Sequence, residues 1–198
     1  MSYQQVFDLL NRYKKSVIPI LIAIDGRCCS GKSTLANKIR ENYDCNIIQI
    51  DDFFLPKELR TAERMAQVGG NIHFERLYEN VILPILYNGE VKYRAYDCQK
   101  QTMSEELNFD RKTLNIVEGV YSQHPRLLEI YHARIFLTVD HSAQSTRLLH
   151  REGKTKVRTF ETSWIPKEEQ YFKEFSIESK SDLIIDTTDI DDNRFNKN

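Results

Sequence analysis

The sequence predicts an α/β fold in which helices cover both faces of a five-stranded parallel sheet. Short apolar runs alternate along the chain with segments of helical periodicity, which is the pattern of strands joined by helical crossovers. A glycine-rich loop also separates the first apolar run from the helical pattern that follows it. The five predicted strands lie at 17–24, 45–50, 114–117, 133–139 and 182–186.

The composition is typical of one soluble domain. The chain has 198 residues, of which 40% are apolar and 29% are charged. Its formal net charge of −1 provides no excess positive field to attract nucleic acid. The N-terminus has no apolar signal core, and no apolar run approaches the ~20 residues that span a bilayer. We therefore expect a soluble, cytoplasmic protein that binds neither membranes nor nucleic acid.

The four cysteines, at positions 28, 29, 45 and 98, form no C-x-x-C pair and show no spacing typical of zinc ligands. Cys28 and Cys29 lie inside the glycine-rich loop, where a disulfide would distort the backbone. We expect all four to be reduced thiols, as is usual in cytosolic proteins.

The glycine-rich loop matches the phosphate-binding pattern G-x-x-x-x-G-K-[ST] without a mismatch. Its glycines let the backbone curl until N–H groups point inward at a positive helix end, which favours phosphate oxygens. Lys32 is expected to reach the β- and γ-phosphates of ATP, and the Ser33 hydroxyl to hold Mg²⁺. The predicted nucleotide-binding residues are Gly26, Arg27, Cys28, Cys29, Ser30, Gly31, Lys32, Ser33 and Thr34.

The segments around this loop have the order that the motif requires. Residues 3–15 carry their apolar side chains on one helical face, which predicts an amphipathic helix. The apolar run at 17–24 suits a buried parallel strand, with Pro19 near its start, where a missing N–H donor is tolerated. Helical spacing follows at 35–43, and a second strand is predicted at 45–50.

The middle of the chain is predicted to be more irregular. Residues 55–73 are polar and interrupted by proline and glycine, so we expect a loop with one helical turn near 62–67. Helical spacing resumes at 74–86, where Pro84 is expected to kink the helix or mark its last turn. A turn and an alternating run at 91–97 then predict a β-hairpin inserted at about 88–112, with its second strand near 101–103 or 108–111.

The C-terminal third is predicted to contain two helices and a lid in addition to the last two strands. A short helix is expected at 126–131 and a longer one at 165–177, the latter opened by a proline. Residues 142–158 look helical at first and then basic and loop-like, so a lid is expected at about 145–160. The polar tail at 189–198 is expected to fray.

Acidic residues follow two of the predicted strands, and ligands of parallel sheets bind at that edge. Asp51 and Asp52 close the strand that we expect beside the strand of the phosphate loop, and adjacent side chains should point opposite ways. Asp51 is the candidate for accepting the proton of an attacking hydroxyl. Asp52 and Glu118 are candidates for the metal site with Ser33. The alternatives are a helix or turn cap for the aspartates and a cap or surface acid for Glu118.

Arg147 and Arg151 are four residues apart and share a helical face in the predicted lid. Arginines carried over the phosphates would stabilise the transferred group and exclude water. The alternative interpretation is a solvated basic helix face.

Four motifs in one order resemble the uridine kinase/phosphoribulokinase family of P-loop kinases: Asp51-Asp52-Phe53-Phe54, 93–97, 116–120 and 182–186. The likeness runs from about Ile18 to Asp186 and is strongest to bacterial uridine kinase-like proteins. It implies a P-loop kinase fold, ATP and Mg²⁺ as cofactors, and a small-molecule acceptor. By position it implies that Asp51 is the proton acceptor, Glu118 the acidic metal-site residue, and Arg147 and Arg151 the lid arginines.

The resemblance also assigns an acceptor side. The substrate-side Tyr-Asp pair of similar proteins falls on Tyr96 and Asp97, and Phe54 stands where uridine kinases often have a tyrosine. His73 replaces an acidic residue that grips ribose hydroxyls in similar proteins. Where uridine kinases carry a histidine that reads uracil, this chain has glutamine or lysine at 99–101, including Gln101. The predicted acceptor-side residues are Phe54, His73, Arg94, Tyr96 and Asp97.

These observations predict an ATP-dependent kinase that phosphorylates a hydroxyl of a small metabolite, most simply the 5′-hydroxyl of a nucleoside. Nicotinamide riboside, pantothenate and sugar phosphates remain alternative acceptors, the last because Arg94 or Arg64 could hold a phosphate. A nucleotide-dependent switch is the alternative from another class. GTPases need a D-x-x-G element and an N-K-x-D base reader, and this sequence has neither. A catalytically silent nucleotide-binding module stays open, as does the oligomeric state.

Overall fold

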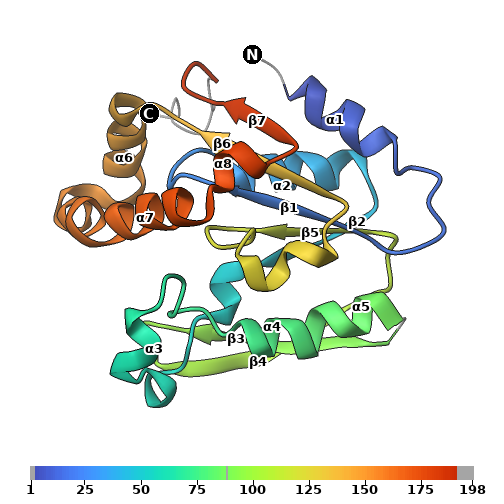
Figure 1. The fold of residues 1–198 in the computed structure, drawn as a ribbon, viewed down its shortest axis with the longest axis horizontal. Helices are drawn as coiled ribbons and strands as arrows, with labels where there is room; N and C mark the ends of the chain where they lie inside the picture. Colours follow the sequence, from blue (N-terminus) through green and yellow to red (C-terminus); the bar gives the residue numbers. More distant parts are fainter. Residues whose placement is uncertain (1–2, 88, 191–198) are drawn as a thin grey trace.

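A parallel sheet forms the centre of the protein (Figure 1). The structure, a computed structural model, describes residues 3–87 and 89–190. In the described residues the sheet has five strands in the order β2-β5-β1-β6-β7, and every neighbouring pair is parallel. The predicted fold class is confirmed. The strands are β1 Ile20–Gly26, β2 Cys45–Gln49, β5 Leu114–Glu118, β6 Ala133–Thr138 and β7 Leu183–Asp186.

Strand β1 is buried along its whole length, but it begins later than predicted. Val17 and Ile18 are 93% and 57% exposed, and pairing with β5 starts at Ile20, opposite Leu114. Pro19, which cannot donate a ladder hydrogen bond, lies just before the first paired residue. The apolar residues before Ile20 made the predicted strand too long, because they do not pair with β5.

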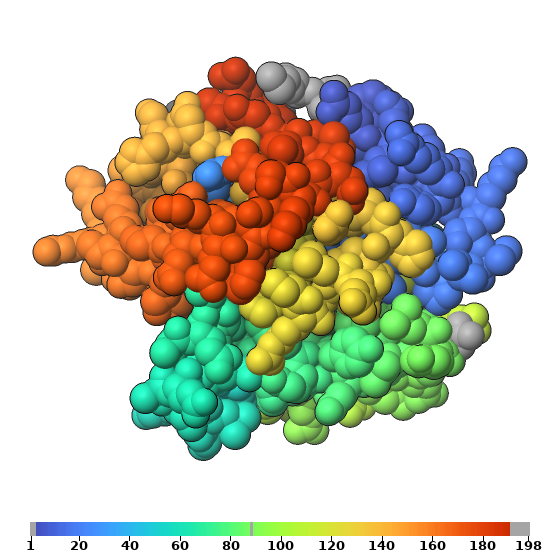
Figure 2. Space-filling model, in the orientation of Figure 1, coloured from blue at the N-terminus to red at the C-terminus, as the bar shows by residue number. Residues whose placement is uncertain are grey.

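The two faces of the sheet are covered by different helices. On one face α1 Gln4–Asn11 and α2 Lys32–Asn42 pack on a core that includes alternate residues of β1. The opposite core contains Leu21 of β1 together with apolar residues of the helical segment 74–87 and of α7 Ile165–Phe175. Figure 2 shows 3₁₀-helix η4 Pro125–Ile130 (yellow) between the C-terminal helices and the green helical layer.

The helical segment predicted at 74–86 contains a π-helical turn before its proline. It consists of α4 Phe74–Leu77, the π turn η3 Tyr78–Ile82, and α5 Leu83–Tyr87. Pro84 has no N–H to give to a carbonyl in the preceding turn, and a wider turn there accommodates its ring. The helix therefore changes to π-type hydrogen bonding before this proline and continues as α-helix to Tyr87.

The inserted hairpin is present as the two-stranded antiparallel sheet of β3 Val91–Asp97 and β4 Thr102–Phe109. Strand β4 extends across the gap between the two positions predicted for it. Tyr93 connects the hairpin to the rest of the protein, because its ring lies 4.8 Å from that of Phe53. Within the hairpin the same ring stacks on Phe109 of β4 at 5.7 Å. Between β2 and the hairpin lie η1 Ile50–Phe53, η2 Lys57–Leu59 and α3 Ala62–Ala66, the last at the predicted helical turn.

The C-terminal third is more helical than predicted. Helix α6 runs from His141 to Thr159 and continues through the π turn η5 Phe160–Trp164 into α7, so the basic stretch expected to be loop-like is helical. Gly153 interrupts α6 with the non-helical angles φ 73° and ψ 166°. Helix α8 Ile177–Lys180 then leads into β7, and most of the tail predicted to fray, from residue 191 on, lies outside the described residues. None of the described helices combines the length and apolar character needed to cross a membrane.

One expectation about the sheet was wrong. Strand β2, which leads into Asp51 and Asp52, does not lie beside β1; β5 lies between them. The order of strands along the chain does not reveal which strand inserts between two others, because that depends on long-range packing. The insertion places Glu118 of β5 directly between the phosphate loop and the aspartates.

Candidate active site

A cavity of about 1070 Å³ opens at the carboxyl ends of the strands. It is lined by three groups of residues that are far apart in the sequence. The phosphate loop and the start of α2 form one wall, and the residues that follow β2 and β5 form another. Side chains of α6, η5 and α7 line the remaining side. The predicted site residues among the described residues that line the cavity are Cys28, Cys29, Ser30, Gly31, Lys32, Ser33, Thr34, Asp51, Phe54, Glu118, Arg147 and Arg151.

The phosphate loop needs its two glycines for different reasons. Gly26 has φ +138°, and a Cβ at that position would lie 2.0 Å from the carbonyl oxygen of Leu137. Gly31 precedes α2 with φ +90°, a left-handed conformation that favours glycine. The loop therefore ends at the N-terminus of α2, where unpaired N–H groups and the helix dipole favour anions.

Lys32 is folded against the loop that it follows. Its ammonium donates hydrogen bonds to the carbonyl oxygens of Gly26 at 2.7 Å and Arg27 at 2.9 Å. The side chain lines the cavity and is held by neutral acceptors, so a polyanion entering the cavity can recruit it without breaking an ion pair.

Ser33 and Glu118 meet directly across the site. The Ser33 hydroxyl donates to the Glu118 carboxylate at 3.0 Å, which joins the start of α2 to the end of β5. Burial raises the pKa of Glu118, and the charge of Lys32 and the Ser33 hydrogen bond partly offset this. A hydroxyl and a carboxylate are hard oxygen ligands of the type that Mg²⁺ binds together with phosphate oxygens and water. The described residues contain no cluster of three or more His, Cys, Asp or Glu residues suited to a metal.

Asp51 and Asp52 point in different directions from the 3₁₀ turn η1. Asp51 lines the cavity, and burial raises the pKa of its carboxyl while Lys32 and Arg151 lower it in part. Asp52 is outside the described lining, and its carboxylate accepts a hydrogen bond of 2.7 Å from the Tyr93 hydroxyl. Its carbonyl oxygen also accepts from Arg76 at 2.9 Å. The structure thus brings Asp51 to the phosphate loop and joins Asp52 to the hairpin, so the metal role of Asp52 stays a prediction without a supporting contact.

The two lid arginines of α6 both reach the phosphate loop. Arg147 donates to the Cys29 carbonyl at 3.4 Å and to the Thr187 carbonyl at 2.6 Å, so it links the loop to the segment after β7. Arg151 donates to the Cys28 sulfur at 3.8 Å and lies 5.5 Å from the centre of the Phe160 ring. Both side chains therefore line the cavity beside the phosphate loop.

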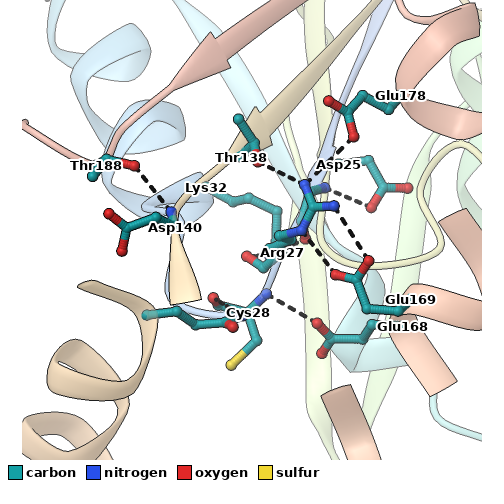
Figure 3. A network of polar contacts seen from close by, with 12 residues as sticks. Asp25, Arg27, Cys28, Lys32, Thr138, Asp140, Glu168, Glu169, Glu178 and Thr188 are labelled. Atoms are coloured by element: carbon teal, nitrogen blue, oxygen red, sulfur yellow. Dashed lines mark hydrogen bonds and ion pairs between the residues drawn. The ribbon is translucent and has the colours of Figure 1, made fainter. Parts of the chain in front are cut away.

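Arg27, predicted to contact the nucleotide, is engaged elsewhere (Figure 3). Its guanidinium donates to Glu169 at 2.8 Å and to the Thr138 hydroxyl at 2.6 Å, and it lies 5.6 Å from the centre of the Phe136 ring. Glu178 is a weaker partner at 3.5 Å. The side chain of Arg27 therefore ties the loop to β6, α7 and α8, and its nucleotide assignment stays a prediction for the backbone.

Two buried carboxylates that the sequence reasoning missed hold the loop in shape. Asp25 accepts hydrogen bonds from the N–H groups of Gly26 at 2.7 Å and Gln123 at 2.9 Å and from the Tyr171 hydroxyl at 2.8 Å. Burial raises the pKa of Asp25 to about 6, although these hydrogen bonds oppose the shift. An acid inside an otherwise apolar strand, directly before the loop, was the available signal.

Glu168 of α7 is the second missed carboxylate. It accepts a hydrogen bond of 2.9 Å from the N–H of Cys28 (Figure 3). Gln144 of α6 donates to the carbonyl of the same residue at 3.0 Å. Burial raises the pKa of Glu168 to about 8. Helices α6 and α7 thus hold both backbone polar groups of Cys28 in the phosphate loop. No local pattern predicts a contact between residues this far apart in the sequence.

The predicted acceptor-side residues are only partly brought to the cavity. Phe54 is in the described lining, whereas His73, Arg94, Tyr96 and Asp97 are not. The Tyr96 hydroxyl accepts from the Lys57 N–H at 3.3 Å. Asp97 caps the hairpin turn by accepting from two N–H groups, those of Gln99 and Lys100. The Arg94 carbonyl accepts from Arg76, and His73 is the N-cap residue directly before α4.

Other polar residues, which were not predicted to bind the acceptor, line the cavity. Asn71 lines it, and its Nδ2 is buried without a hydrogen-bond partner in the structure. Arg60, Gln67 and Gln99 line it as well. A buried amide donor without a partner costs free energy, and a ligand acceptor atom would satisfy it. Asn71 lay in the segment read as a loop, where no periodicity distinguishes a functional residue.

Comparisons with known proteins agree with the motif-based resemblance. No model of a known protein family matches the chain. Uridine kinases from Clostridium novyi and Staphylococcus haemolyticus are 27% and 28% identical to it over 154 and 152 residues. These matches cover 73% and 72% of this chain, and the same shares of the relatives. The resemblance to uridine kinases is therefore confirmed at the level of sequence similarity.

The fold is also shared with a solved structure. A protein described as a "possible uridine kinase" from Bacillus stearothermophilus superposes with a TM-score of 0.68 at 17% identity. The superposition covers 94% of this chain and 100% of that one. At this identity the match shows the fold alone, and it agrees with a P-loop kinase architecture.

Proposed function

We propose that this protein is an ATP-dependent phosphotransferase that moves the γ-phosphoryl group of ATP to a hydroxyl of a small metabolite, with a nucleoside 5′-hydroxyl as the first candidate. One observation carries the proposal. Lys32, the Ser33–Glu118 pair and Asp51 all face one cavity at the carboxyl edge of the sheet. These groups supply what phosphoryl transfer needs: phosphate binding, oxygen ligands for a metal, and a carboxylate base.

Three groups of residues would bind the nucleotide phosphates and the metal. The loop backbone and Lys32 bind the phosphates, and Lys32 exchanges its two carbonyl acceptors for phosphate oxygens. Ser33 and Glu118 would hold Mg²⁺, which when bound neutralises charge on the β- and γ-phosphates. Arg147 and Arg151 stabilise the charge on the transferred group and help exclude water.

Asp51 accepts the proton of the attacking hydroxyl. A base is most effective when its pKa is near the working pH, and burial moves the pKa of Asp51 upward from the usual range of a carboxyl. The charges of Lys32 and Arg151 lower the pKa of Asp51 and so oppose the effect of burial.

The sequence relatives support a nucleoside as acceptor, because they are named uridine kinases. Two residues that line the cavity also suit a nucleoside. Phe54 offers a ring face for stacking, and Asn71 offers an unsatisfied buried amide. Nicotinamide riboside, pantothenate and a sugar phosphate are the other acceptors to be compared.

The first test is ATP consumption in a coupled assay with uridine, cytidine, nicotinamide riboside, pantothenate and sugar phosphates. We expect acceptor-dependent consumption with at least one nucleoside. Asp51→Asn should reduce turnover by ~10²–10⁴-fold because it removes the base, while binding of a non-hydrolysable ATP analogue persists. Asp8→Asn, at an exposed position of α1, is the matched control and should retain turnover. Consumption with none of these acceptors would favour a silent nucleotide-binding module, and normal turnover of Asp51→Asn would reject the role of Asp51.

A further inference from the structure

The phosphate loop carries two adjacent thiols that the proposed phosphoryl transfer does not use. Cys28 is buried and Cys29 is half-buried, and both line the cavity. Their sulfur atoms lie 3.7 Å apart, with the Cys28 thiol donating to the Cys29 sulfur. Cys29 has the positive φ of 59°, an uncommon conformation for a residue other than glycine.

Positive groups surround this pair. The Arg151 guanidinium donates to the Cys28 sulfur at 3.8 Å, so donation runs from Arg151 to Cys28 and from Cys28 to Cys29. Such a chain favours negative charge on the Cys29 sulfur, because each donor stabilises the acceptor that follows it. In the same direction, the Cys28 hydrogen bond and the charges of Arg151 and Lys32 lower the pKa of Cys29 against the effect of its burial. Glu168 is the carboxylate that faces the pair and opposes this.

We propose that Cys29 is a site of reversible oxidation by hydroperoxides, with Cys28 as the resolving thiol and a disulfide between the two neighbours as the product. The surroundings are those of a reactive cysteine: a cavity open to small molecules, flanking cations, and a second thiol in contact with the first.

The chemistry balances in two steps. The Cys29 thiolate attacks one peroxide oxygen, the O–O bond breaks, and the leaving alkoxide or hydroxide takes a proton to become an alcohol or water. The sulfur is oxidised to a sulfenic acid and the peroxide is reduced. The Cys28 sulfur then attacks the Cys29 sulfur, the S–O bond breaks, and hydroxide leaves as water with the Cys28 proton. The protein has then lost two hydrogen atoms and gained one S–S bond.

The disulfide would change the shape of the loop. Its sulfur atoms must approach from 3.7 Å to about 2.05 Å. Adjacent Cα atoms are about 3.8 Å apart, which is closer than the usual span of a disulfide. The peptide between the two residues must therefore twist, although Glu168 and Gln144 hold the polar groups of Cys28. We expect the oxidised loop to lose nucleotide binding, and the strained bond to be readily reduced by thiols.

The test uses the full-length protein with Cys98→Ser, which removes the exposed thiol and leaves Cys45 as a buried internal control. The protein is treated with hydrogen peroxide, with and without Mg²⁺-ATP, and followed by peptide mass spectrometry and binding of a fluorescent ATP analogue. We expect the peptide containing Cys28 and Cys29 to lose about 2 Da and ATP affinity to fall at least about tenfold. Dithiothreitol should restore both, and bound ATP should slow the reaction.

Two variants assign the roles of the thiols. Cys28→Ser should stop at the sulfenic acid of Cys29, which dimedone traps, because the resolving thiol is gone. Cys29→Ser should leave Cys28 reduced over the same time, because Cys28 is buried and donates its proton.

Modification of Cys45 while the loop thiols stay reduced would overturn the proposal, as would a loop disulfide that leaves ATP affinity unchanged. Only the expected loss of ATP binding rests on the proposed function, whereas oxidation of the two thiols does not. If the reduced protein does not bind ATP, the proposed function fails, and the mass change still decides whether the thiols react.

Discussion

At the residue scale, the neighbouring Asp51 and Asp52 show how position sets chemical role. They are the same residue type in the same 3₁₀ turn, yet one faces the cavity and the other binds the Tyr93 hydroxyl. A 3₁₀ helix has three residues per turn, so consecutive side chains lie about 120° apart around its axis, and here only Asp51 faces the cavity. The one in the cavity is a candidate base, and the other connects the turn to the hairpin.

Glu168 has a pH dependence that can be measured. Its folded pKa of about 8 lies above the ordinary value for a glutamate, so the folded state binds more protons than the unfolded state between these two values. The contribution of Glu168 to stability is therefore complete below about pH 4.5 and is lost as the pH rises towards 8. Asp25, whose raised pKa of about 6 acts in the same direction, is unchanged in the comparison below.

Glu168→Gln should remove this loss, because a glutamine side chain does not ionise and its carbonyl oxygen can still accept from the Cys28 N–H. We expect urea unfolding at pH 5 and pH 8.5 to show a smaller decrease in the free energy of unfolding for Glu168→Gln than for the unchanged protein. The difference should be on the order of a few kcal/mol at most. Glu174→Gln, an exposed position on the same helix, is the matched control. An identical pH dependence for all three proteins would show that Glu168 is not ionised differently in the folded state.

At the scale of elements, helix α6 is shaped by one glycine. Gly153 interrupts the helix two residues after Arg151, with backbone angles that residues other than glycine rarely adopt. A Cβ added there would meet no atom within 4 Å, so the cost of replacing it is a backbone cost only. The interruption therefore depends on the residue type at this position and not on crowding.

Gly153→Ala tests this interruption by the sign of its effect on stability. We expect the substitution to lower the free energy of unfolding by ~1–3 kcal/mol, because alanine is strained at these angles. In a regular helix the same substitution would raise stability by roughly 0.5–1 kcal/mol. Denaturant unfolding distinguishes the two, with exposed Thr155→Ala as a control expected within about ±0.5 kcal/mol. A gain in stability would mean that α6 is continuous in solution.

The elements around the site also hold the phosphate loop in place. Asp25 binds the N–H at the start of the loop, Arg27 ties it to α7 and α8, and Glu168 and Gln144 hold Cys28. These contacts come from β1 and from the helices α6, α7 and α8. A displacement of α6 or α7 would therefore act directly on the phosphate loop.

At the scale of the whole molecule, the cavity couples nucleotide binding to stability. A ligand that binds only the folded state stabilises it by about 2.7 kcal/mol at a concentration 100 times its Kd. For a chain of this length that corresponds to a rise in Tm of roughly 5–10 °C. We expect a non-hydrolysable ATP analogue with Mg²⁺ to produce such a rise in a thermal-shift measurement, and a true acceptor to add to it.

Lys32→Ala should reduce this rise, because it removes the ammonium that lines the cavity beside the loop carbonyls. Lys15→Ala, an exposed lysine after α1, is the matched control and should retain the full shift. A shift of equal size in Lys32→Ala would place the nucleotide somewhere other than the phosphate loop.

The fold class and half of the site could be predicted from local patterns. The phosphate loop, the two strands that end in acids, and the arginine pair at i, i+4 are each readable within a few residues, because strand and helix periodicity and loop geometry are local properties. Strand β1 was predicted too early and the helix after Gly153 was missed, since exposure and pairing decide where an element ends.

Tertiary structure alone decided which of these elements meet. It inserted β5 between β1 and β2, which brings Glu118 to Ser33, and it turned Asp52 towards the hairpin. It also carried Glu168 and Gln144 from the C-terminal helices to the backbone of Cys28. Sequence by itself determined which chemical groups the chain offers, because those depend on residue type and short spacing. Which groups share a cavity depends on contacts between residues 41 to 140 positions apart, which no local pattern encodes.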